Sequence, residues 1–598
     1  MIFLYYDELE AYIKKLKIQL KKTKKRKELR KLKQQVAHCK LLAAFIDEDY
    51  EETRKKLRSM LKAGNITYDL SWALFKPDTI AYTPTYGNKD DPRAFRVDMT
   101  YHEEDFLGNE KLVIEGRYLE YDGKLFGMGD YAVRIPSFKG PKKIVNLDAY
   151  PLKYHKDPVG LEKQLVERGQ KFVALQGMNY RVHKGIGYMK QKRSVARVNV
   201  DGRVMVDPAI FRRIQPNYYL SYIKQDEVGV DSDSDSDSNC DNDSDADSEG
   251  EKSGSSTPKR LIVWKDKKGK KHLIPVPVGN NPDAPDEKLE SIEKNDSIQH
   301  IFTEEELLIA SPVVLGFAFS EKCWLELSLL GIRDIEWNQE AFSSLVLQPK
   351  YKQNLKGLVR SHRFNAAKTI DDVIQGKGKG MVVVLHGPPG VGKTLTAESI
   401  AEYLRCPLYM VSAGELGTNS RSLENDLNRI MDITHSWGAI LLIDEADVFM
   451  EARQAHDIHR NSLVSVFLRL LEYYQGILFL TTNRVATFDE AFQSRIHMGI
   501  RYEELTQKAR LEIWKHHIEK VVTMEGPESV PFKDEDIEEL ARKVLNGRQI
   551  KNTVKTAQSI ALSEKEPFGI SHVKRVLEVQ EDFQEDMKGG RAALAHYA

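Results

Sequence analysis

The sequence is poor in cysteine and contains no long apolar run. Only four cysteines occur in 598 residues, and no two of them form a C-x-x-C pair. Neither a disulfide framework nor a zinc ribbon is therefore supported, and a reducing compartment is favoured. No apolar stretch reaches the length of a membrane-spanning helix, and the first residues lack the layout of a signal peptide. We expect an intracellular protein, cytoplasmic or nuclear, with no membrane span.

The chain also lacks net charge. Lys plus Arg and Asp plus Glu both number 89, so the overall balance carries no information about partners. The charges are instead segregated into basic and acidic blocks, and it is this distribution that is informative. A chain of this length is too long for one hydrophobic core, and we expect about three to five domains.

Residues 7–62 contain neither glycine nor proline, so we predict a helical arm over 1–62. Positions 14–33 of this arm are almost wholly basic. Three interpretations stay open: a solvated arm or short coiled coil, a nuclear localisation signal, or a nucleic-acid patch. The basic block contains no aromatic residue, which argues against binding of single strands by stacking.

The pattern of residues 63–336 is rich in strands, and we predict a β-rich N-terminal region that chooses the binding partner. An Asp-Gly turn predicts a hairpin over 118–126, and a second Asp-Gly predicts another over 198–206. Further strands are expected at 313–319 and 324–327. His183, beside two basic residues, is expected on the surface.

An acidic tract of Asp, Ser and Glu, residues 226–258, interrupts this region. It has almost nothing apolar to bury, so we expect it to be disordered. It is predicted either to be a plain solvated spacer or to be phosphorylated at its serines, each modification adding about −1.5 to −2 charges. Strand patterns return at 261–264 and 272–276, so the tract is predicted to be a loop within the region.

Residues 386–394 read His-Gly-Pro-Pro-Gly-Val-Gly-Lys-Thr, which is the G-x-x-x-x-G-K-T phosphate-binding loop. An apolar strand pattern precedes it and a helical pattern follows it. Backbone N–H groups and the helix N-terminus would together bind the phosphates of ATP. Lys393 would contact the β- and γ-phosphates, and the Thr394 hydroxyl would bind Mg²⁺. The nucleotide-binding residues predicted here are Gly387, Pro388, Pro389, Gly390, Val391, Gly392, Lys393, Thr394 and Leu395.

A second apolar strand pattern, residues 439–443, ends in Asp444-Glu445. A carboxylate at a strand end can hold Mg²⁺, so we predict Thr394 and Asp444 as its protein ligands. The neighbouring Glu445 can orient and deprotonate a water, and we predict that it is the catalytic base. An apolar run before Asp-Glu alone means only a strand end, but in combination with the phosphate loop it indicates an ATPase.

The region from residue 337 onward resembles the AAA family of ring-forming ATPases. After the two motifs above, residues 477–483 form an apolar strand pattern ending in Asn483, and residues 488–496 resemble the family's second region of homology. The resemblance implies that Asn483 positions the attacking water. It also implies that Arg495 is an arginine finger, which reaches the nucleotide of a neighbouring subunit.

Residues 510–517 resemble the start of the family's helical lid, and residues 546–552 resemble its sensor 2 motif. On this resemblance His517 contacts the ribose and Arg548 contacts a phosphate, although both could equally be lid-surface residues. The implied fold is α/β: a P-loop NTPase αβα sandwich with a five-stranded parallel sheet over 337–520 and a helical lid over 521–598. The basic helix and the β-rich region precede it.

The chain departs from the family at residues 412–419, where many members carry an aromatic residue in the pore loop. The stretch here contains two glycines and no aromatic, so threading of an unfolded polypeptide is not expected. The combination of a strand-rich region with this ATPase is similar to uncharacterised AAA proteins of filamentous fungi.

From these features we predict an oligomeric ATPase, a homo-oligomeric ring and most simply a hexamer. ATP and Mg²⁺ would be its cofactors, and hydrolysis would drive remodelling of a protein client bound through the β-rich region. The alternative is a nucleic-acid-dependent ATPase that uses the basic N-terminal helix.

Overall fold

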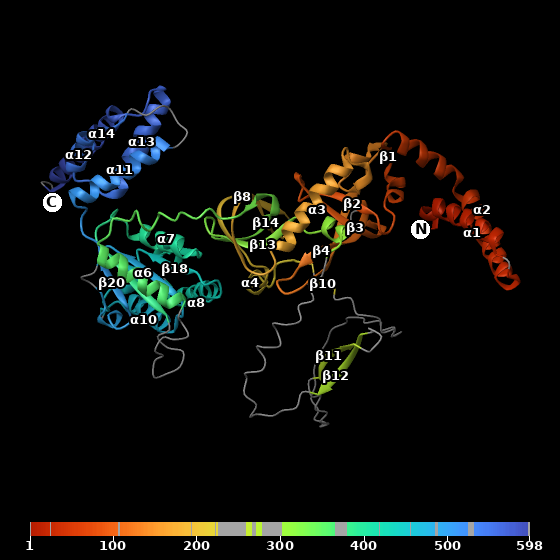
Figure 1. Ribbon diagram of the computed structural model, residues 1–598, viewed down its shortest axis with the longest axis horizontal. Helices are drawn as coiled ribbons and strands as arrows, with labels where there is room; N and C mark the ends of the chain where they lie inside the picture. The colour runs from red at the N-terminus through yellow and green to blue at the C-terminus, as the bar shows by residue number, and fades with distance from the viewer. Residues whose placement is uncertain are drawn as a thin grey trace.

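Figure 1 shows the computed structural model, which places helices at both ends of the chain and β-sheets between them. The acidic tract 226–258 lies outside the residues that the structure describes. These are residues 2–23, 25–105, 108–192, 194–221, 223–224, 259–265, 271–277, 302–364, 380–417, 419–454, 456–484, 488–523 and 531–595.

The N-terminal arm is a pair of helices, α1 (Tyr6–Lys22) and α2 (Arg26–Lys62), rather than one continuous helix. The chain is extended at Thr23, between them, and α1 folds back against α2 (Figure 1). This packing buries Ile13 and Leu16. Burial of this apolar stripe, together with the repulsion expected within the basic run around the break, accounts for the reversal.

The β-rich region is built on two antiparallel sheets. The first has six strands in the order β10-β5-β4-β3-β2-β7, and the second has five in the order β14-β13-β9-β8-β15. The first sheet comprises β2 (Ile80–Thr85), β3 (Asn88–Glu104), β4 (Glu110–Tyr121), β5 (Phe126–Pro136), β7 (Tyr150–Pro151) and β10 (Ile223–Lys224). The second comprises β8 (Asn179–Lys190), β9 (Val195–Val206), β13 (Val313–Ala318), β14 (Cys323–Ser328) and β15 (Ile332–Arg333).

Short elements complete this region. A separate hairpin, β11 (Lys259–Lys265) with β12 (Lys271–Pro277), carries the strand patterns expected there, and β1 (Asn65–Ile66) pairs with β6 (Lys142–Lys143). The helices are α3 (Pro158–Ala174), α4 (Pro208–Ile214) and α5 (Glu304–Leu308). Thr303 and Glu306 form a capping box at the start of α5, which satisfies two free backbone N–H groups.

Two predictions for this region are wrong. Residues 198–206 are not a hairpin, because β9 runs without a turn from Val195 to Val206 and pairs along its length with β8. Gly202 is accommodated in the strand opposite His183. His183 itself is fully buried, and its Nε2 lies 3.0 Å from the carbonyl oxygen of Ser328. The hairpin predicted over 118–126 is confirmed, since Tyr121 pairs with Phe126 across the turn between β4 and β5.

The C-terminal half contains a five-stranded parallel sheet in the order β17-β18-β19-β16-β20, as the fold prediction requires. Successive side chains of a strand face opposite sides of a sheet, and both sides are apolar here. On one side α8 (Ser420–Ser436) and α10 (Ile458–Tyr473) pack, and on the other α6 (Pro349–Phe364) and α7 (Lys393–Leu404) (Figure 1). The strands are β16 (Met381–His386), β17 (Leu408–Ser412), β18 (Ile440–Asp444), β19 (Ile477–Thr482) and β20 (Met498–Arg501).

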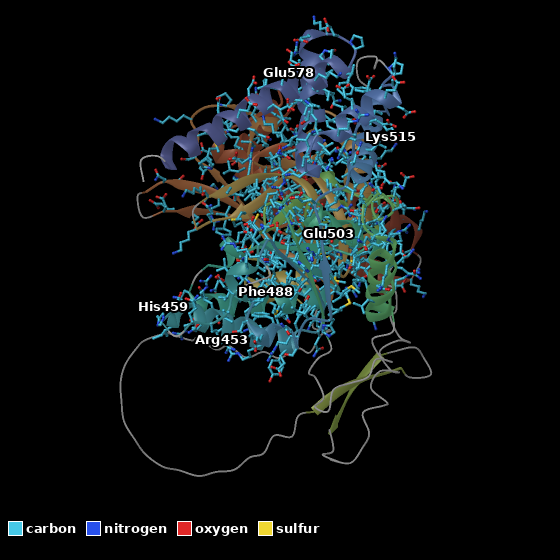
Figure 2. The ribbon with its side chains drawn as sticks, turned by 90° about the vertical axis from the view of Figure 1, so that its left-hand side faces the viewer. Arg453, His459, Phe488, Glu503, Lys515 and Glu578 are labelled. Atoms are coloured by element: carbon cyan, nitrogen blue, oxygen red, sulfur yellow. The ribbon has the colours of Figure 1, made fainter. Side chains whose placement is uncertain are left out.

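The lid is a separate group of helices with its own core around the fully buried Trp514, and its first helix begins at Gln507, ahead of the expected boundary at residue 521. Figure 2 shows Glu503 on the connection between sheet and lid, and Lys515 beyond it on the first lid helix. The helices are α11 (Gln507–Thr523), α12 (Asp534–Arg542), α13 (Gly547–Glu564) and α14 (Ile570–Ala595). Among the helices of the described residues, none combines the length and apolar composition needed to cross a bilayer.

Candidate nucleotide-binding site

The phosphate loop joins the end of β16 to the start of α7. Its three glycines, Gly387, Gly390 and Gly392, all have positive φ, a backbone conformation that other residues adopt only at a cost. Gly390 also lacks room for a side chain, because a Cβ there would lie 2.6 Å from the side chain of Asn546 in the lid. The backbone N–H of Gly547 donates to the Gly390 carbonyl at 2.9 Å. The lid therefore rests directly on the phosphate loop.

Lys393 is the first residue of α7 and is 8% exposed. Its ammonium group donates to the carbonyl oxygens of Gly387 and Pro388, at 2.8 and 2.7 Å, and to Oδ1 of Asn483 at 2.8 Å. Burial lowers the pKa of Lys393, which the carboxylate of Asp444 opposes. The loop thus concentrates a partly desolvated cation and a helix N-terminus, both of which favour an anion.

Asp444 ends β18 and faces the loop. Thr394 donates from its hydroxyl to Oδ1 of Asp444 at 3.2 Å, and the Thr481 hydroxyl of β19 also donates to this carboxylate. The pairing of parallel strands brings residues far apart in the sequence to one edge of the sheet. A hydroxyl and a carboxylate are hard oxygen ligands of the kind that Mg²⁺ prefers, so Thr394 and Asp444 fit this ion.

Glu445 follows directly and has a left-handed backbone, with φ +56°. Its N–H donates to the Thr481 hydroxyl at 3.0 Å. A non-glycine residue in this conformation costs about 1–3 kcal/mol and persists only where its surroundings enforce it. The turn places the exposed Glu445 carboxylate at the wall of the cleft described next.

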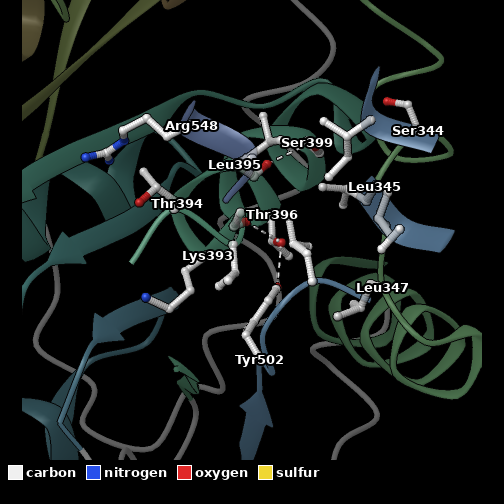
Figure 3. A pocket seen from close by; sticks show the side chains of 18 of the residues that line it. Ser344, Leu345, Leu347, Lys393, Thr394, Leu395, Thr396, Ser399, Tyr502 and Arg548 are labelled. Carbon is white, nitrogen blue, oxygen red and sulfur yellow. Dashed lines mark hydrogen bonds between the residues drawn. The ribbon is translucent and has the colours of Figure 1, made fainter. Parts of the chain in front are cut away.

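A cleft of about 1230 Å³ lies beside the loop, between the sheet and the lid (Figure 3). Figure 3 shows Lys393, Thr394 and Arg548 turned toward it from two different elements. Its lining includes these predicted residues: Pro389, Gly390, Val391, Gly392, Lys393, Thr394, Leu395, Asp444, Glu445, Asn483, His517 and Arg548. Residues from both motifs and from the lid therefore share one cavity large enough for a nucleotide.

The two lid residues reach the cleft from neighbouring helices. His517 lies on α11, and burial, reinforced by His516 and Lys520, lowers its pKa to about 4. It is therefore neutral at pH 7 and can serve as a hydrogen-bonding group rather than as a cation. Arg548 is the second residue of α13, close enough to Lys393 to lower the pKa of that ammonium group.

Arg495 lies elsewhere. Its Nη1 donates to the Ala491 carbonyl at 2.9 Å, and its Nη2 pairs with Glu472 of α10 at 3.3 Å. Its buried Nε has no hydrogen-bond partner. Arg495 is not among the residues that line the cleft of its own chain, so within one chain it cannot act on a nucleotide bound there.

Two parts of the site were not predicted from the sequence. Residues 343–348, ahead of α6, and Pro349 at its start form one wall of the cleft, and no motif marks them. Tyr502, in the connection to the lid, shares a 2.6 Å hydrogen bond with the hydroxyl of Thr396 on α7 (Figure 3). Its position shortly after β20 gave no signal, because a lone tyrosine after a strand is common.

Comparison with known proteins identifies two regions of the chain. Residues 383–503 match the family described as ATPase family associated with various cellular activities (AAA), and residues 56–156 match a domain of unknown function, DUF7025. A 26S proteasome regulatory subunit 8 homolog of Encephalitozoon cuniculi is 31% identical over 219 residues, covering 34% of this chain. The ATPase family AAA domain-containing protein 3A homolog of Drosophila melanogaster is 25% identical over 192 residues, covering 31% of this chain.

The human ATPase family AAA domain-containing protein 3B is 24% identical over 245 residues, which cover 38% of this chain. The chain spans only 51%, 30% and 36% of the lengths of the Encephalitozoon, Drosophila and human relatives. The sequence similarity therefore covers only part of each relative, and it does not assign the relatives' activities or partners to this chain.

Proposed function

Because residues 383–503 are an AAA ATPase domain, we propose that this chain hydrolyses Mg-ATP and uses the reaction to remodel a protein client or complex. The observation that carries the proposal is the meeting of Lys393, Thr394, Asp444 and Glu445 in one cleft that the lid closes from the other side. Phosphoryl transfer to water depends on positioning and on charge neutralisation more than on covalent chemistry. The cleft supplies groups of both kinds.

We assign the roles as follows. The loop N–H groups and Lys393 bind the phosphates, and Thr394 with Asp444 holds Mg²⁺, which would neutralise charge on the phosphate oxygens. Glu445 accepts the proton of the attacking water. Asn483, whose Oδ1 now accepts from Lys393, orients that water when a phosphate takes its place on the ammonium group.

Replacement of Lys393 by alanine tests the nucleotide site. We expect ATP affinity to fall at least about hundredfold, because two charge-assisted hydrogen bonds of about 1.5–3 kcal/mol each are lost. Titration with a fluorescent ATP analogue measures this. Lys508→Ala, at an exposed lysine that also lines the cleft, is the matched control and should bind nearly as the parent does. Equal losses in the two variants would remove the special role of Lys393.

AAA ATPases typically act as oligomers, and we propose a homo-oligomeric ring, most simply a hexamer. The position of Arg495 supports this, because the guanidinium lies outside the cleft of its own chain and is paired there with Glu472, the Ala491 carbonyl and the Ser494 hydroxyl. In a ring it would be supplied to the nucleotide of the adjacent subunit. Turnover per subunit should then rise with protein concentration as rings assemble.

A cluster of aromatic rings supports a mechanical role for the β-rich region. Phe317 of β13 stacks on Tyr409 of β17, with ring centroids 5.4 Å apart and planes at 16°. Trp437, which follows α8, packs against Phe317 and Trp324. The cluster is buried and joins the second antiparallel sheet to the ATPase sheet. Movement of this edge of the ATPase would carry the β-rich region with it.

Polar contacts surround the aromatic cluster. The Trp437 indole donates to Oδ2 of Asp207 at 3.0 Å. Lys322, at the tip of the β13–β14 turn, contacts both oxygens of Glu415 at 2.5 and 2.6 Å. Glu415 lies in the 412–419 stretch that we compared with the family's pore loop. The β-rich region therefore holds that stretch directly.

Leu416 is the one sizeable apolar residue of the 412–419 stretch, and its position gives a physical reason why this stretch differs from a pore loop that grips polypeptide. Its side chain is 2% exposed and belongs to the core beneath α8. A buried leucine cannot grip a translocating chain. We propose that the client is remodelled by rigid movement of the β-rich region and not by threading.

Leu416→Ala distinguishes a core residue from a gripping one. We expect the free energy of unfolding to fall by about 2–5 kcal/mol, the cost of deleting buried methyl groups, as measured by chemical denaturation. Leu562→Ala, at an exposed position of α13, is the control and should change stability by less than about 0.5 kcal/mol. Unaltered stability of Leu416→Ala would contradict its placement in the core.

Variants of Trp437 and Asp207 test the contact between the β-rich region and the ATPase sheet. Trp437→Phe keeps a ring and removes the indole donor, so we expect the free energy of unfolding to fall by about 1–3 kcal/mol. Asp207→Ala alone removes the acceptor of this hydrogen bond and also the cap that Asp207 makes on α4. The two effects should be less than additive in the double variant, because both remove the same hydrogen bond. Full additivity would show that the two residues do not interact.

A further inference from the structure

A second cavity, of about 210 Å³, lies in the β-rich region, far along the chain from the nucleotide cleft. Both antiparallel sheets contribute to its wall: Arg93, Tyr118 and Tyr131 from the first, and Lys190 and Glu326 from the second. Its volume is below the roughly 300–1,000 Å³ of sites for drug-sized molecules. It can therefore hold only waters or one small compound.

Arg93 is the central charged group of this cavity. It is 4% exposed, and its guanidinium carbon lies 4.5, 5.1 and 5.9 Å from the ring centroids of Tyr131, Tyr118 and Tyr86. Such rings attract a cation, but they accept no ordinary hydrogen bond from its edge. The buried Nε has no hydrogen-bond partner, and in the described part of the chain no carboxylate pairs with Arg93.

The other charged groups of the wall have partners. Glu326 accepts from Tyr86 at 2.5 Å and pairs with Lys190 at 2.8 Å. Glu120 accepts from the Tyr118 hydroxyl at 2.8 Å and from the Tyr121 N–H at 3.0 Å. Arg134, at the edge, pairs with Glu103 at 3.1 Å. A buried donor without an acceptor thus remains at Nε of Arg93, whereas these two buried acids are satisfied.

We propose that this cavity binds the oxyanion group of a small molecule, a carboxylate or a phosphate, through the guanidinium of Arg93. Leaving a buried donor without a partner costs more than an average hydrogen bond contributes, and a planar guanidinium matches the two oxygens of such a group. Tyr131 would add a hydrogen bond, and the surrounding rings would pack against the body of the ligand.

The local electrostatics agree with an anion. The charge of Glu326 is already balanced by Lys190. Burial raises the pKa of Glu120, so its neutral form is favoured and its repulsion of an anion is reduced. The guanidinium of Arg93 stays charged, because Tyr131, Tyr86 and Tyr118 offset its desolvation and raise its pKa. The guanidinium of Arg93 is therefore the positive charge that the ligand would meet, with Asp130 as a further acid in the wall.

Binding of two simple probes to the full-length protein tests the proposal. Benzoate represents a carboxylate and inorganic phosphate represents a phosphate ester, and both are titrated by calorimetry with the nucleotide cleft saturated by Mg-ADP. We expect at least one of them to bind with a dissociation constant in the millimolar range or below. The probe that binds identifies the source of the oxyanion. Benzamide, neutral and similar in shape to benzoate, should bind at least about tenfold more weakly than benzoate. The proposal is overturned if neither anion binds, or if benzoate is the binding probe and benzamide matches it.

Variants then place the bound anion. Arg93→Lys keeps the positive charge and loses the planar fork, and should weaken binding about ten- to hundredfold. Tyr131→Phe keeps the ring, leaves the fold in place and should weaken binding about two- to tenfold. Arg96→Lys is the matched control, because Arg96 lies on the same strand and pairs instead with Glu305 at 2.7 Å; it should leave binding unchanged. Unchanged binding in both cavity variants would exclude this cavity as the site, and if Arg93→Lys does not fold, Tyr131→Phe decides.

Discussion

Glu445→Gln is expected to bind ATP and to hydrolyse it at least about hundredfold more slowly than the parent, the usual scale for a lost general base. The substitution keeps the size of the side chain and leaves Thr394, Asp444 and Lys393 in place, so phosphate and metal contacts are unaffected. The left-handed turn at Glu445 is enforced by its neighbours, and glutamine can occupy it at a similar cost. Steady-state phosphate release measures turnover, and nucleotide titration measures binding.

The control for this prediction is Glu503→Gln. Glu503 also lines the cleft, from the connection between sheet and lid (Figure 2), and is exposed. Glu503→Gln removes the same negative charge, but Glu503 has no proposed role in the reaction. Turnover should therefore stay within about twofold of the parent, on the scale of ordinary surface substitutions. Turnover that survives in Glu445→Gln would remove this residue from the mechanism, whatever the result for Glu503.

Arg495→Ala is expected to reduce turnover by a factor of about 10³–10⁵, the effect of arginine fingers in other nucleotide hydrolases. The expectation depends on transfer of the guanidinium from its pair with Glu472 to the phosphates of a neighbour. ATP binding should persist, because Arg495 does not line the cleft of its own chain. Arg469→Ala is the matched control: Arg469 also lies on the large subdomain, in an ion pair with Glu424 at 2.5 Å.

Mixing of two inactive variants tests whether Arg495 acts on a neighbour. A subunit with Arg495→Ala keeps Glu445, and a subunit with Glu445→Gln keeps Arg495. At an interface where the second supplies Arg495 to the first, a complete site forms, and part of the turnover should return. If mixed oligomers are confirmed and no ratio restores turnover, Arg495 is not a finger acting between subunits.

The ATPase half of the fold could be predicted from the sequence because its signals are local. The apolar runs before Gly387 and Asp444 are buried parallel strands, and the glycines of the loop have the positive φ values that a tight anion-binding turn requires. Parallel strands end at one edge of a sheet, so polar residues at strand ends meet there. The roles of the site residues remain predictions, but their convergence on one cleft follows from that rule.

The features that only the tertiary structure decided depend on contacts between segments far apart in the sequence. An Asp-Gly pair is compatible with a turn, yet pairing with β8 keeps β9 straight through Gly202. Leu416 lies in a glycine-containing stretch whose composition is typical of a loop. Only the packing of α8 shows that its side chain belongs to the core. The aromatic cluster around Phe317 and Trp437 joins residues more than a hundred positions apart. Sequence periodicity reports which face of a strand or helix is apolar, but not which surface covers it. For the same reason the unpaired Arg93 and its cavity could be recognised only once both sheets were in place.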